Sequence, residues 1–376
     1  MTLSSVSNKS WIFKEYNDQD ILFYKENYSL DEITSKLLSI RKIKKEEVQA
    51  FLSPSIKNFL PNPEIISDMQ KSAKRTTQAI TNKHKVGIFG DYDVDGASAT
   101  ALLANYFSKI NICHEIYIPD RKTEGYGPSV ESIKKLIDNG VKLIFTVDCG
   151  TLSFDAIEFA FINKIDVIIL DHHQSEENLP KAYSVVNPNR LDDKSNLKYL
   201  CAAGVTFMFL VSLNKELRSI KWFIENQIIE PNLIDFLDLV ALGTVCDVVP
   251  LIGLNRAIVS QGLKILKFKK NLGLKTLLEI CGVQSKPSVY HIGYLLGPRI
   301  NAGGRVGKST HGANLLINKN PKDVFKLASE LDIFNKERQL LEKEVLNKIL
   351  TEIGNKIHDP VIIIDGKNWH EGVIGI

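Results

Sequence analysis

The sequence predicts an α/β fold: an open, mostly parallel sheet flanked by helices, followed by a long connector helix and the start of a second, smaller α/β domain. Three observations lead to this prediction. Between residues 85 and 250, short apolar runs alternate with helix-like stretches, as in strand–helix–strand units. Acidic or histidine-bearing motifs come directly after several of these runs. After residue 319, a long amphipathic stretch leads to one further apolar run.

Residues 1–84 are predicted to form a mostly helical N-terminal segment. The run Ser29-Leu30-Asp31-Glu32 is typical of a helix start, with Ser29 as the cap and Glu32 three residues later. Three prolines interrupt the helical pattern: Pro54, Pro61 and Pro63. A second helix is expected around Ser67 to Asn82.

Residues 85–318 form the predicted main domain and contain the alternating pattern. The runs that favour strands are Val86–Phe89, Glu115–Ile118, Leu143–Val147, Val167–Leu170 and Ser184–Val186. The helix-like stretches between them are Ala97–Ile110, Ser129–Asn139 and Phe154–Asn163. Residues 200–317 are expected to be chiefly helical, with a glycine-rich interruption at Gly297–Gly307. Open parallel sheets bind ligands beyond the carboxyl ends of their strands, so a site is expected at that edge.

Residues 319–356 are predicted to form one long amphipathic helix. Asn320 is the expected cap, Pro321 the first helical residue and Gly354 the end. At 1.5 Å per residue, the helix would be about 50 Å long, the length of a connector between two domains. Its apolar face comprises Leu327, Leu331, Phe334, Leu341, Val345, Ile349 and Ile353. Residues 357–376 are then the predicted beginning of the second domain, with a strand at Val361–Ile364.

Composition limits the class of protein. The 376 residues are 44% apolar, enough for a full core, and the formal charge of +3 is too small to indicate nucleic-acid binding by itself. Five widely spaced cysteines indicate reduced thiols rather than a disulfide framework. The N-terminus is polar, and no apolar run reaches the roughly 18 to 20 residues that span a membrane. We therefore expect a cytoplasmic protein that makes no membrane contact.

The first motif is GDYDVDG, from Gly90 to Gly96, which places Asp91, Asp93 and Asp95 at every second position. In an extended segment this spacing points all three carboxylates to the same side. They would repel one another strongly unless a cation lay between them. A solvated acidic loop is the alternative explanation for this motif.

Three further motifs supply more polar side chains. Asp148 in TVDCG follows an apolar run, and helix capping is the alternative role for it. Asp171, His172 and His173 follow four apolar residues in LDHH; adjacent histidines project in different directions, so only one is expected to be a direct ligand. The other would face the substrate or satisfy a buried hydrogen bond. Asp247 in VCDVVP lies among apolar residues and needs a partner, which is a metal, an arginine or a backbone amide.

Together the motifs favour a two-metal site at successive ends of one sheet. Mixed carboxylate and imidazole ligands suit Mn²⁺ or Mg²⁺, and the imidazole favours Mn²⁺. Two such ions roughly 3.5 to 4 Å apart activate a water molecule and stabilise a leaving oxygen on phosphorus. Zinc is disfavoured because no cysteine ligand is expected. Cys149 and Cys246 flank ligand positions but are expected to pack as small residues.

Two glycine-containing segments, IPDRKTEGYG and GPRINAGGR, place positive charge near this site. Glycine lets a backbone approach phosphate closely, and the arginine guanidinium group binds phosphate oxygens. The side chains concerned are Arg121, Lys122, Tyr126, Arg299, Asn301 and Arg305. An ordinary turn with solvated arginines is the alternative for both segments. For Tyr126, packing is the alternative to stacking on a base.

The motif set resembles a known family. GDYDVDG, IPDR with EGYG, TVDCG, LDHH, CDVVPL and GPRINAGGR are similar to motifs of the DHH phosphoesterase superfamily, and specifically of RecJ-type single-strand-specific exonucleases. The resemblance extends to FLSP, ISDM, NKERQ in the long helix and the final WHEGVIGI. LDHH alone indicates only the superfamily, whereas GDYDVDG together with GPRINAGGR is specific to the RecJ branch.

The resemblance implies an α/β domain that holds two Mn²⁺ or Mg²⁺ ions, joined by the long helix to a DHH-associated domain that holds DNA. It implies hydrolysis of single-stranded DNA from the 5′ end to mononucleotides, in recombination and repair. By motif position, the metal ligands would be Asp93, Asp95, Asp148, His172 and Asp247. The catalytic residues would be His173, Asp171 and Asp91, with His173 polarising the scissile phosphate or assisting the leaving group. The expected nucleic-acid contacts are Arg121, Tyr126, Arg299, Asn301 and Arg305.

Chains of the RecJ type continue beyond WHEGVIGI into the rest of the associated domain and usually an OB-fold. We therefore expect a C-terminally truncated form with a weakened grip on its substrate. Two alternatives stay open: a DHH-type phosphatase or oligonucleotide-degrading enzyme, and an inactive remnant that binds metal or a partner protein. Single-stranded DNA is the expected partner of a monomeric chain, and recombination or single-strand-binding proteins are further candidates.

Overall fold

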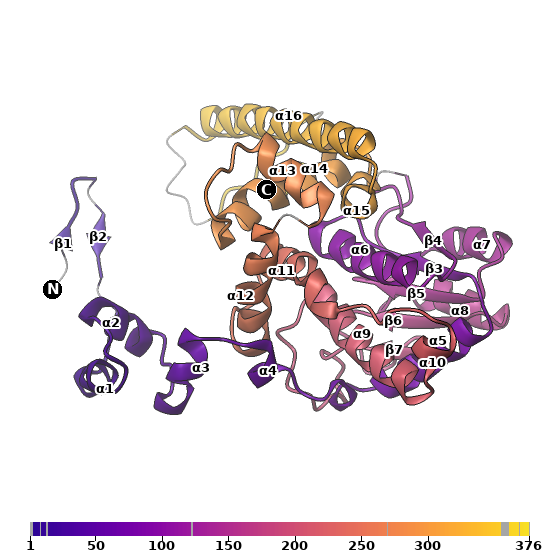
Figure 1. The fold of residues 1–376 in the computed structure, drawn as a ribbon. Helices are drawn as coiled ribbons and strands as arrows, with labels where there is room; N and C mark the ends of the chain where they lie inside the picture. Colours follow the sequence, from indigo (N-terminus) through magenta and orange to yellow (C-terminus); the bar gives the residue numbers. More distant parts are fainter. Residues whose placement is uncertain are drawn as a thin grey trace.

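The computed structural model describes residues 3–7, 9–12, 14–121, 123–268, 270–354, 361–367 and 369–375. A five-stranded sheet forms its centre, with strand order β4-β3-β5-β6-β7 and every neighbouring pair parallel (Figure 1). The strands are β3 (Val86–Phe89), β4 (His114–Tyr117), β5 (Leu143–Val147), β6 (Asp166–Leu170) and β7 (Ser184–Val186). The predicted α/β class with an open parallel sheet is thus confirmed.

The strands lie where the apolar runs predicted them. The bounds of β3, β5 and β7 are those expected, β4 lies one residue earlier, and β6 begins one residue earlier. All residues of β3, β5 and β7 are buried, which is why these strands appear as continuous apolar runs rather than alternating ones. The register pairs Phe89 with Thr146, and Val147 with Leu170, so that three strands end at one edge.

Helices cover both faces of the sheet (Figure 1). On one face Ile88 and Phe145 belong to a core shared with three helices, and on the other Phe89 and Ile144 pack with two. The first three are α5 (Met69–Thr81), α6 (Val94–Lys109) and α9 (Ala202–Ser219). The other two are α7 (Val130–Asp138) and α8 (Phe154–Ile162). The expected helix between β3 and β4 begins three residues earlier than predicted.

A second, helical layer follows the sheet in sequence. Its elements are α10 (Trp222–Glu225), η3 (Leu233–Phe236), α11 (Leu237–Cys246), α12 (Gly253–Lys267), α13 (Leu272–Ile280), the π-helix η4 (His291–Leu296), α14 (Gly297–Val306), α15 (His311–Ile317) and α16 (Pro321–Ile353). Asn320 caps α16, Pro321 is its first residue and Gly354 ends it, as predicted. The helix lies across α13, α14 and α15 (Figure 1), and its buried residues all precede Lys336.

The N-terminal residues form a small lobe beside α12 (Figure 1). It contains the strand pair β1 (Leu3–Ser4) and β2 (Ser10–Trp11), α1 (Asp18–Tyr28), α2 (Glu32–Ile40), η1 (Lys45–Glu47), α3 (Val48–Leu52), α4 (Ile56–Phe59) and η2 (Pro63–Ile65). The predicted cap at Ser29 was wrong. Asp31 caps α2 by accepting a hydrogen bond from the Thr34 amide, because Ser29 already ends α1 in a left-handed conformation with φ 51°.

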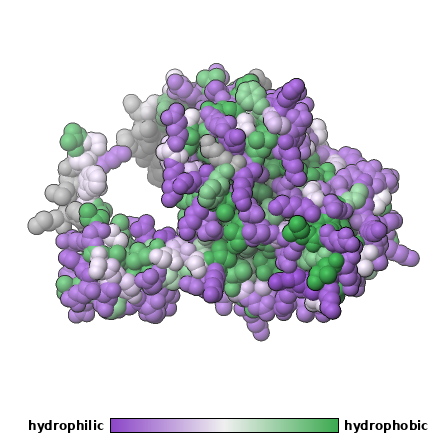
Figure 2. All heavy atoms as spheres, viewed as in Figure 1, coloured by the Kyte–Doolittle hydropathy of each residue, from purple (hydrophilic) through white to green (hydrophobic). Residues whose placement is uncertain are grey.

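The predicted strand at Val361–Ile364 is absent. Residues 361–366 lie in irregular structure, because they pair with no other strand among the described residues. Residues 355 and 356 of the predicted connector helix, and residues 357–360, Asn368 and Ile376 of the predicted second-domain start, lie outside the described part of the chain. On the face shown in Figure 2, hydrophilic residues cover most of the surface and apolar residues gather mainly near its centre. None of the helices among the described residues is long and apolar enough to cross a membrane.

The contact between α11 and α12 depends on a glycine. A Cβ atom on Gly262 of α12 would lie 2.3 Å from the Leu237 carbonyl oxygen and 2.5 Å from the Ala241 Cβ atom. Only a residue without a side chain therefore lets α12 approach α11 so closely. Gly204 in the first turn of α9 differs, because a Cβ atom there would meet its nearest neighbour, Leu200 Cδ2, at an ordinary 3.4 Å.

We expect Gly262→Ala to lower the free energy of unfolding by about 1–3 kcal/mol, because the two helices must separate to admit the methyl group. The matched change Gly204→Ala should leave stability unchanged or raise it by up to about 1 kcal/mol through helix propensity. Urea denaturation followed by circular dichroism measures both. Equal stabilities of the two variants would contradict the close-packing argument.

Candidate metal centre

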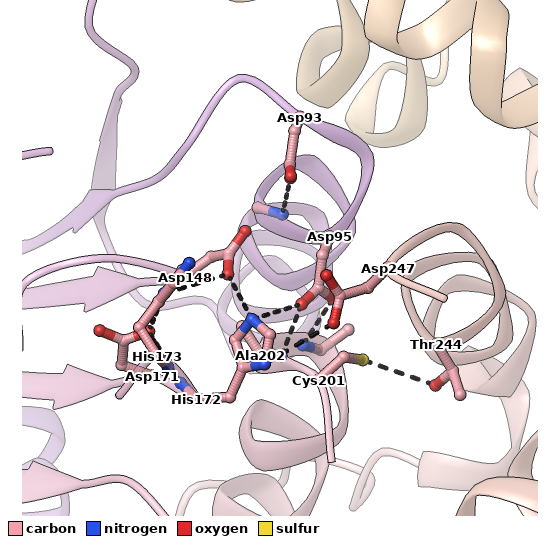
Figure 3. Close-up of polar contacts among 12 residues, drawn as sticks. Asp93, Asp95, Asp148, Asp171, His172, His173, Cys201, Ala202, Thr244 and Asp247 are labelled. Carbon is pink, nitrogen blue, oxygen red and sulfur yellow. Dashed lines mark hydrogen bonds and ion pairs between the residues drawn. The ribbon is translucent and has the colours of Figure 1, made fainter. Parts of the chain in front are cut away.

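The four motifs meet at the edge of the sheet where β3, β5 and β6 end. Asp148 follows β5 directly, and His172 lies two residues after the end of β6. Asp95 lies in the first turn of α6, which follows β3, and Asp247 comes from a helix on the other side (Figure 3). Convergence at the carboxyl ends of parallel strands is the arrangement expected for a ligand site in this fold class.

The first motif does not have the extended conformation that the sequence analysis assumed. Its second half is helical: Asp93 caps α6 by accepting a hydrogen bond from the Gly96 amide at 2.9 Å, and Asp95 lies in the first helical turn. Asp93 takes the capping position rather than an extended one, because its carboxylate satisfies an amide that the helix leaves unpaired. Gly96 is required there, since a Cβ atom would lie 2.6 Å from the Asp91 Cβ atom.

Asp95 is buried and held by the start of a second helix. Its two carboxylate oxygens accept hydrogen bonds from the Ala202 amide at 2.6 Å and the Ala203 amide at 3.0 Å, in the first turn of α9. Amides at a helix N-terminus stabilise a negative charge, so they partly compensate the burial of this carboxylate. Gly243 of α11 lies against the same group, because a Cβ atom there would be 2.4 Å from Asp95 Oδ1.

Asp148 adopts a left-handed backbone conformation with φ 61°. Few residues other than glycine adopt this conformation, and it commonly marks a functional site. Two hydrogen bonds hold it: the Asp148 amide donates to the Leu170 carbonyl at 3.1 Å, and the Tyr126 hydroxyl donates to the Asp148 carbonyl at 2.8 Å. Its carboxylate is thereby directed toward the histidines (Figure 3).

His172 lies between three carboxylates. Its Nε2 atom is 3.2 Å from Asp148 Oδ1 and 3.8 Å from Asp95 Oδ2, and its Nδ1 atom is 3.6 Å from Asp247 Oδ2. Both ring nitrogens therefore face acidic groups.

His173 makes a different contact. Its Nδ1 atom is 2.7 Å from Asp171 Oδ1 and 4.0 Å from Asp148 Oδ1, and 45% of its side chain is exposed. Asp171 is fully buried and also accepts hydrogen bonds from Thr151 and from the backbone amide of His172. Asp171 thus orients His173 and is not itself available to a ligand. The hydrogen bond to Asp171 raises the pKa of His173 to about 9.

Asp247 does not lie at a strand end, contrary to the sequence-based expectation for the fourth motif. It is the C-cap of α11, and the apolar run before it is a helix rather than a strand. The next residue, Val248, has φ 60° and is 85% exposed. A β-branched residue in that conformation is strained, and the strain lies beside Asp247.

The negative charges of the carboxylates in this centre repel one another, and this repulsion adds to burial in raising the pKa values of Asp91, Asp148 and Asp247. Burial and then the neighbouring Asp93 raise the pKa of Asp91 to about 7. Burial, then Asp95 and Asp93, raise the pKa of Asp247 to about 7. The pKa of Asp148 is raised well above its usual value by burial and then by Asp93 and the other aspartates. A nearby positive charge is therefore needed if these groups are to be ionised together.

The residues fit divalent cations. Three buried carboxylate oxygens, Asp91 Oδ1, Asp148 Oδ1 and Asp247 Oδ2, accept no hydrogen bond from any described residue. Buried oxygens without partners are costly unless an ion or water binds them. Ligand atoms within 4.8 Å of one another occur in three sets: Asp95, His172 and Asp247; Asp91, Asp93 and Asp148; and Asp148, His172 and His173. Asp148 belongs to two of these sets, so the cluster has room for more than one ion.

The thiols near the centre face away from this chemistry. Cys149 Sγ donates to the Val147 carbonyl, and Cys246 Sγ to the Ile292 carbonyl. Burial raises the pKa of both thiols well above the usual range, so they are not thiolates at neutral pH. The available donors are carboxylate oxygens and imidazole nitrogens, which suit Mn²⁺ or Mg²⁺ rather than a thiolate-bound ion.

The predicted glycine-rich interruption at Gly297–Gly307 is instead mainly the helix α14. Its glycines serve helix packing rather than a flexible loop: a Cβ atom on Gly304 would lie 2.9 Å from the Tyr92 ring. Arg299 donates to Asp332 at 2.9 Å and to the Leu295 carbonyl at 2.8 Å, which fixes α14 to α16. Asn301 accepts a hydrogen bond from the Val94 amide and so supports the first turn of α6. Arg299 and Asn301 therefore have partners within the protein, and their contact with nucleic acid stays a prediction.

Of the other predicted contacts, Arg121 is exposed, whereas Arg305 is half-buried and donates a hydrogen bond to the Gly372 carbonyl at 2.9 Å. Arg121 and Arg305 line one cavity of about 510 Å³, together with Trp369 and His370. The Arg121 guanidinium lies 5.3 Å from the centre of the Tyr92 ring. Lys122 lies outside the described residues.

Tyr126 is 55% exposed and contacts the metal-centre residues directly. Its ring lies edge-on to His173 with centroids 6.0 Å apart, and its hydroxyl is bonded to the Asp148 carbonyl. Packing, the alternative to stacking on a base, therefore explains the position of the Tyr126 hydroxyl.

Known proteins support this assignment of the fold and motifs. Residues 85–244 match the model of the DHH family, N-terminal domain. The single-stranded-DNA-specific exonuclease RecJ of Escherichia coli is 36% identical over 334 residues, which is 86% of this chain and 58% of that protein. A crystal structure of exonuclease RecJ bound to manganese is 30% identical with a TM-score of 0.71, covering 82% of this chain and 76% of that one. The chain belongs to the RecJ branch of the DHH family.

One further family structure, RecJ of Thermus thermophilus in complex with Mn²⁺, has a TM-score of 0.78 at 26% identity, covering 96% of this chain and 50% of that one. The chain spans a little over half the length of the first curated relatives that it matches, at 56% and 58%. The match that shows family membership thus covers the part of these relatives that corresponds to the sheet and the metal centre.

Sequence reasoning missed three features of the centre. The Ala202 and Ala203 amides that hold Asp95 have no side-chain signature, and Gly243 is one of many glycines. The role of Tyr126 in holding the Asp148 backbone also required the folded structure. A buried aspartate one turn into a helix was the only available signal, since such a carboxylate must find amide partners.

We expect Asp148→Asn to make the metal-free protein more stable and to abolish most of its stabilisation by Mn²⁺. The change removes one charge from a mutually repelling buried group, but also the oxygen shared by two ligand sets. Saturating Mn²⁺ at about 100 times its Kd should stabilise the unaltered chain by about 2.7 kcal/mol. Thermal unfolding with EDTA and with Mn²⁺ measures both effects.

The control is Asp155→Asn, which alters an exposed first-turn aspartate of α8 and should keep the full Mn²⁺ shift. An undiminished Mn²⁺ shift in Asp148→Asn would show that Asp148 is not a ligand.

Proposed function

We propose that the chain hydrolyses single-stranded DNA from its 5′ end to mononucleotides, using two divalent cations, in recombination and repair. The observation that carries the proposal is the convergence of buried carboxylates around His172 at the edge of the sheet, where the oxygens Asp148 Oδ1 and Asp247 Oδ2 accept no hydrogen bond from any described residue. Membership of the RecJ branch supports the substrate and the 5′ polarity. Manganese in two family structures supports Mn²⁺, with Mg²⁺ as the alternative.

The ligand sets suggest how the ions would be held. We propose that Asp95, His172 and Asp247 bind one ion, that Asp91 and Asp93 bind the other, and that Asp148 contacts both. When bound, such a pair of ions activates water and stabilises the leaving oxygen on phosphorus. The amides of α9 keep the Asp95 carboxylate in place before any ion arrives, so this part of the site is preorganised.

His173 is proposed to act on the scissile phosphate. Asp171 accepts a hydrogen bond from His173 Nδ1, which fixes the ring and raises the pKa of His173. A half-exposed imidazolium beside the ligands can donate to a phosphate oxygen and so neutralise developing charge. Tyr126, bonded to the Asp148 carbonyl and lying edge-on to His173, would limit movement of both residues.

Arg121 and Arg305 are the proposed phosphate contacts, because they share one open cavity. Arg299 and Asn301 have partners within the protein, as Arg305 does through its hydrogen bond to the Gly372 carbonyl, and their contact with nucleic acid stays a prediction. A DNA substrate favours a cytoplasmic location, and a monomer that meets recombination or single-strand-binding proteins is consistent with the proposal.

Hydrolysis of labelled strands tests the proposal. With Mn²⁺, single-stranded DNA labelled at its 5′ end should release labelled mononucleotide from the first turnover, whereas a 3′ label should stay in long products until late. Duplex DNA and pyrophosphate should be poor substrates. Asp148→Ala should abolish the cleavage. A preference for pyrophosphate would indicate a small-phosphate hydrolase instead, and Mn²⁺ binding without any cleavage would indicate an inactive remnant.

Asp171→Asn should lower kcat on single-stranded DNA by about 10²-fold or more, because His173 loses the partner that orients and charges it. The Mn²⁺-induced rise in melting temperature should persist, since Asp171 is not in any ligand set. Single-turnover kinetics and thermal unfolding measure the two effects. Asp138→Asn, an exposed change at the end of α7, is the control and should alter neither.

A further inference from the structure

We propose that Tyr290 and Tyr294 form a platform on which bases of the single-stranded substrate stack, on the helix that packs against the end of α11. This inference rests on the proposed function, which it extends from the phosphate backbone to the bases. The two residues are called the tyrosine platform below. No motif of the sequence analysis included them.

The two rings are already arranged as a stack that is open to solvent. Their centroids are 5.2 Å apart and their planes are inclined by 24°. Tyr290 is 59% exposed and Tyr294 is 72% exposed. Neither hydroxyl makes a hydrogen bond within the described part of the chain, so no polar contact explains their position. Two large exposed aromatic faces side by side are costly in water and typical of a surface that binds a planar group.

The backbone beneath the platform is unusual. Tyr294 lies in the π-helix η4, and Tyr290 is the residue just before it. π-helical turns are rare and occur frequently at functional sites. Residues four apart lie on the same side of a helix, which is why the two rings meet. The His291 ring lies beside the platform, edge-on to the Tyr290 ring with centroids 5.8 Å apart.

The platform lies close to the metal centre because η4 packs on the end of α11. A Cβ atom on Gly293 would meet Val245 Cγ1 at 3.5 Å, and Cys246 Sγ donates to the Ile292 carbonyl at 3.7 Å. Asp247 is the next residue of the chain. Summing the chain spacings across this contact places the Cα atoms of Tyr294 and Asp247 within about 20 Å of each other.

The same continuous helix also reaches the proposed phosphate contacts. The helix that begins at η4 continues through α14 to Arg305, which lines the cavity with Arg121. At 1.5 Å per residue, the eleven steps from Tyr294 to Arg305 span about 17 Å, roughly the length of five stacked nucleotides. The platform and Arg305 therefore lie on one helix, and a nucleobase is the planar group that a strand bound at Arg305 would bring to the platform.

Stacking on tyrosine is tolerant of sequence, because every base has an aromatic face. The platform would therefore hold a strand without selecting its sequence, as an enzyme that moves along DNA requires. A duplex offers no unstacked base to such a surface, so the platform would also favour single strands.

Binding of a fluorescent strand tests the inference. The probe is a short phosphorothioate-linked single strand that carries 2-aminopurine, whose emission falls when it stacks, at one position at a time. The unaltered chain should quench the emission at one or two interior positions. The double variant Tyr290→Ala, Tyr294→Ala should lose this quenching and weaken strand binding by about 5- to 150-fold, the range for loss of base stacking.

Two further variants separate stacking from a general loss of structure. Tyr290→Phe with Tyr294→Phe keeps both rings and should restore the quenching. Phe325→Ala removes an aromatic side chain of α16 that is 62% exposed, and should leave quenching and affinity unchanged. The Mn²⁺-induced rise in melting temperature of the alanine variant should match that of the unaltered chain, which shows that the metal centre is intact.

Each outcome decides the inference. Unchanged quenching and affinity in the alanine variant would overturn it while leaving the proposed hydrolysis standing. A change in oligomeric state with unchanged strand binding would also overturn it and identify a protein contact. Loss of quenching in a chain that binds strands but never cleaves them would support the platform and refute the proposed hydrolysis.

Discussion

Mutual repulsion among the buried aspartates is the constraint on which the rest of this structure depends. Asp91, Asp95, Asp148 and Asp247 lie in a region where burial raises the pKa of each, and His172 alone cannot compensate them. A fold that gathers such groups must hold them rigidly, since otherwise they would turn toward water. The same cost makes the cluster a strong binder of divalent cations, because each ion removes several repulsions at once.

The surrounding elements supply that rigidity through backbone groups. The first turn of α9 holds both oxygens of Asp95, and the Tyr126 hydroxyl holds the carbonyl of Asp148 in its left-handed conformation. Gly243 lets α11 come close enough for Asp247 to face His172 from the side opposite the sheet. Residues from α6, α11 and the end of β5 thus face one imidazole, which explains why the metal centre lies where the sheet and the helical layer join.

The sequence predicted the parts of this arrangement that local pattern determines. Buried parallel strands appear as apolar runs, so the sheet and the positions of Asp148 and His172 followed directly. Asp247 was assigned to the same site but to the wrong kind of element, because an apolar run before an aspartate precedes a buried helix as readily as a strand. GPRINAGGR was expected to be a loop because glycine is common in loops. It forms a helix because tertiary packing against Tyr92 and α16 outweighs the low helix propensity of glycine.

Because the segment GPRINAGGR is helical, its glycines have a different role from the one expected of a loop. In a loop, its glycines would expose backbone amides to phosphate; in a helix, those amides are already bonded, so the segment acts through its shape and its two ends. Arg299 and Asp332 fix the middle to α16, and Asn301 ties it to the first turn of α6 beside Asp93. Movement of this helix would therefore shift the metal ligands, the cavity at Arg305 and the tyrosines before it together.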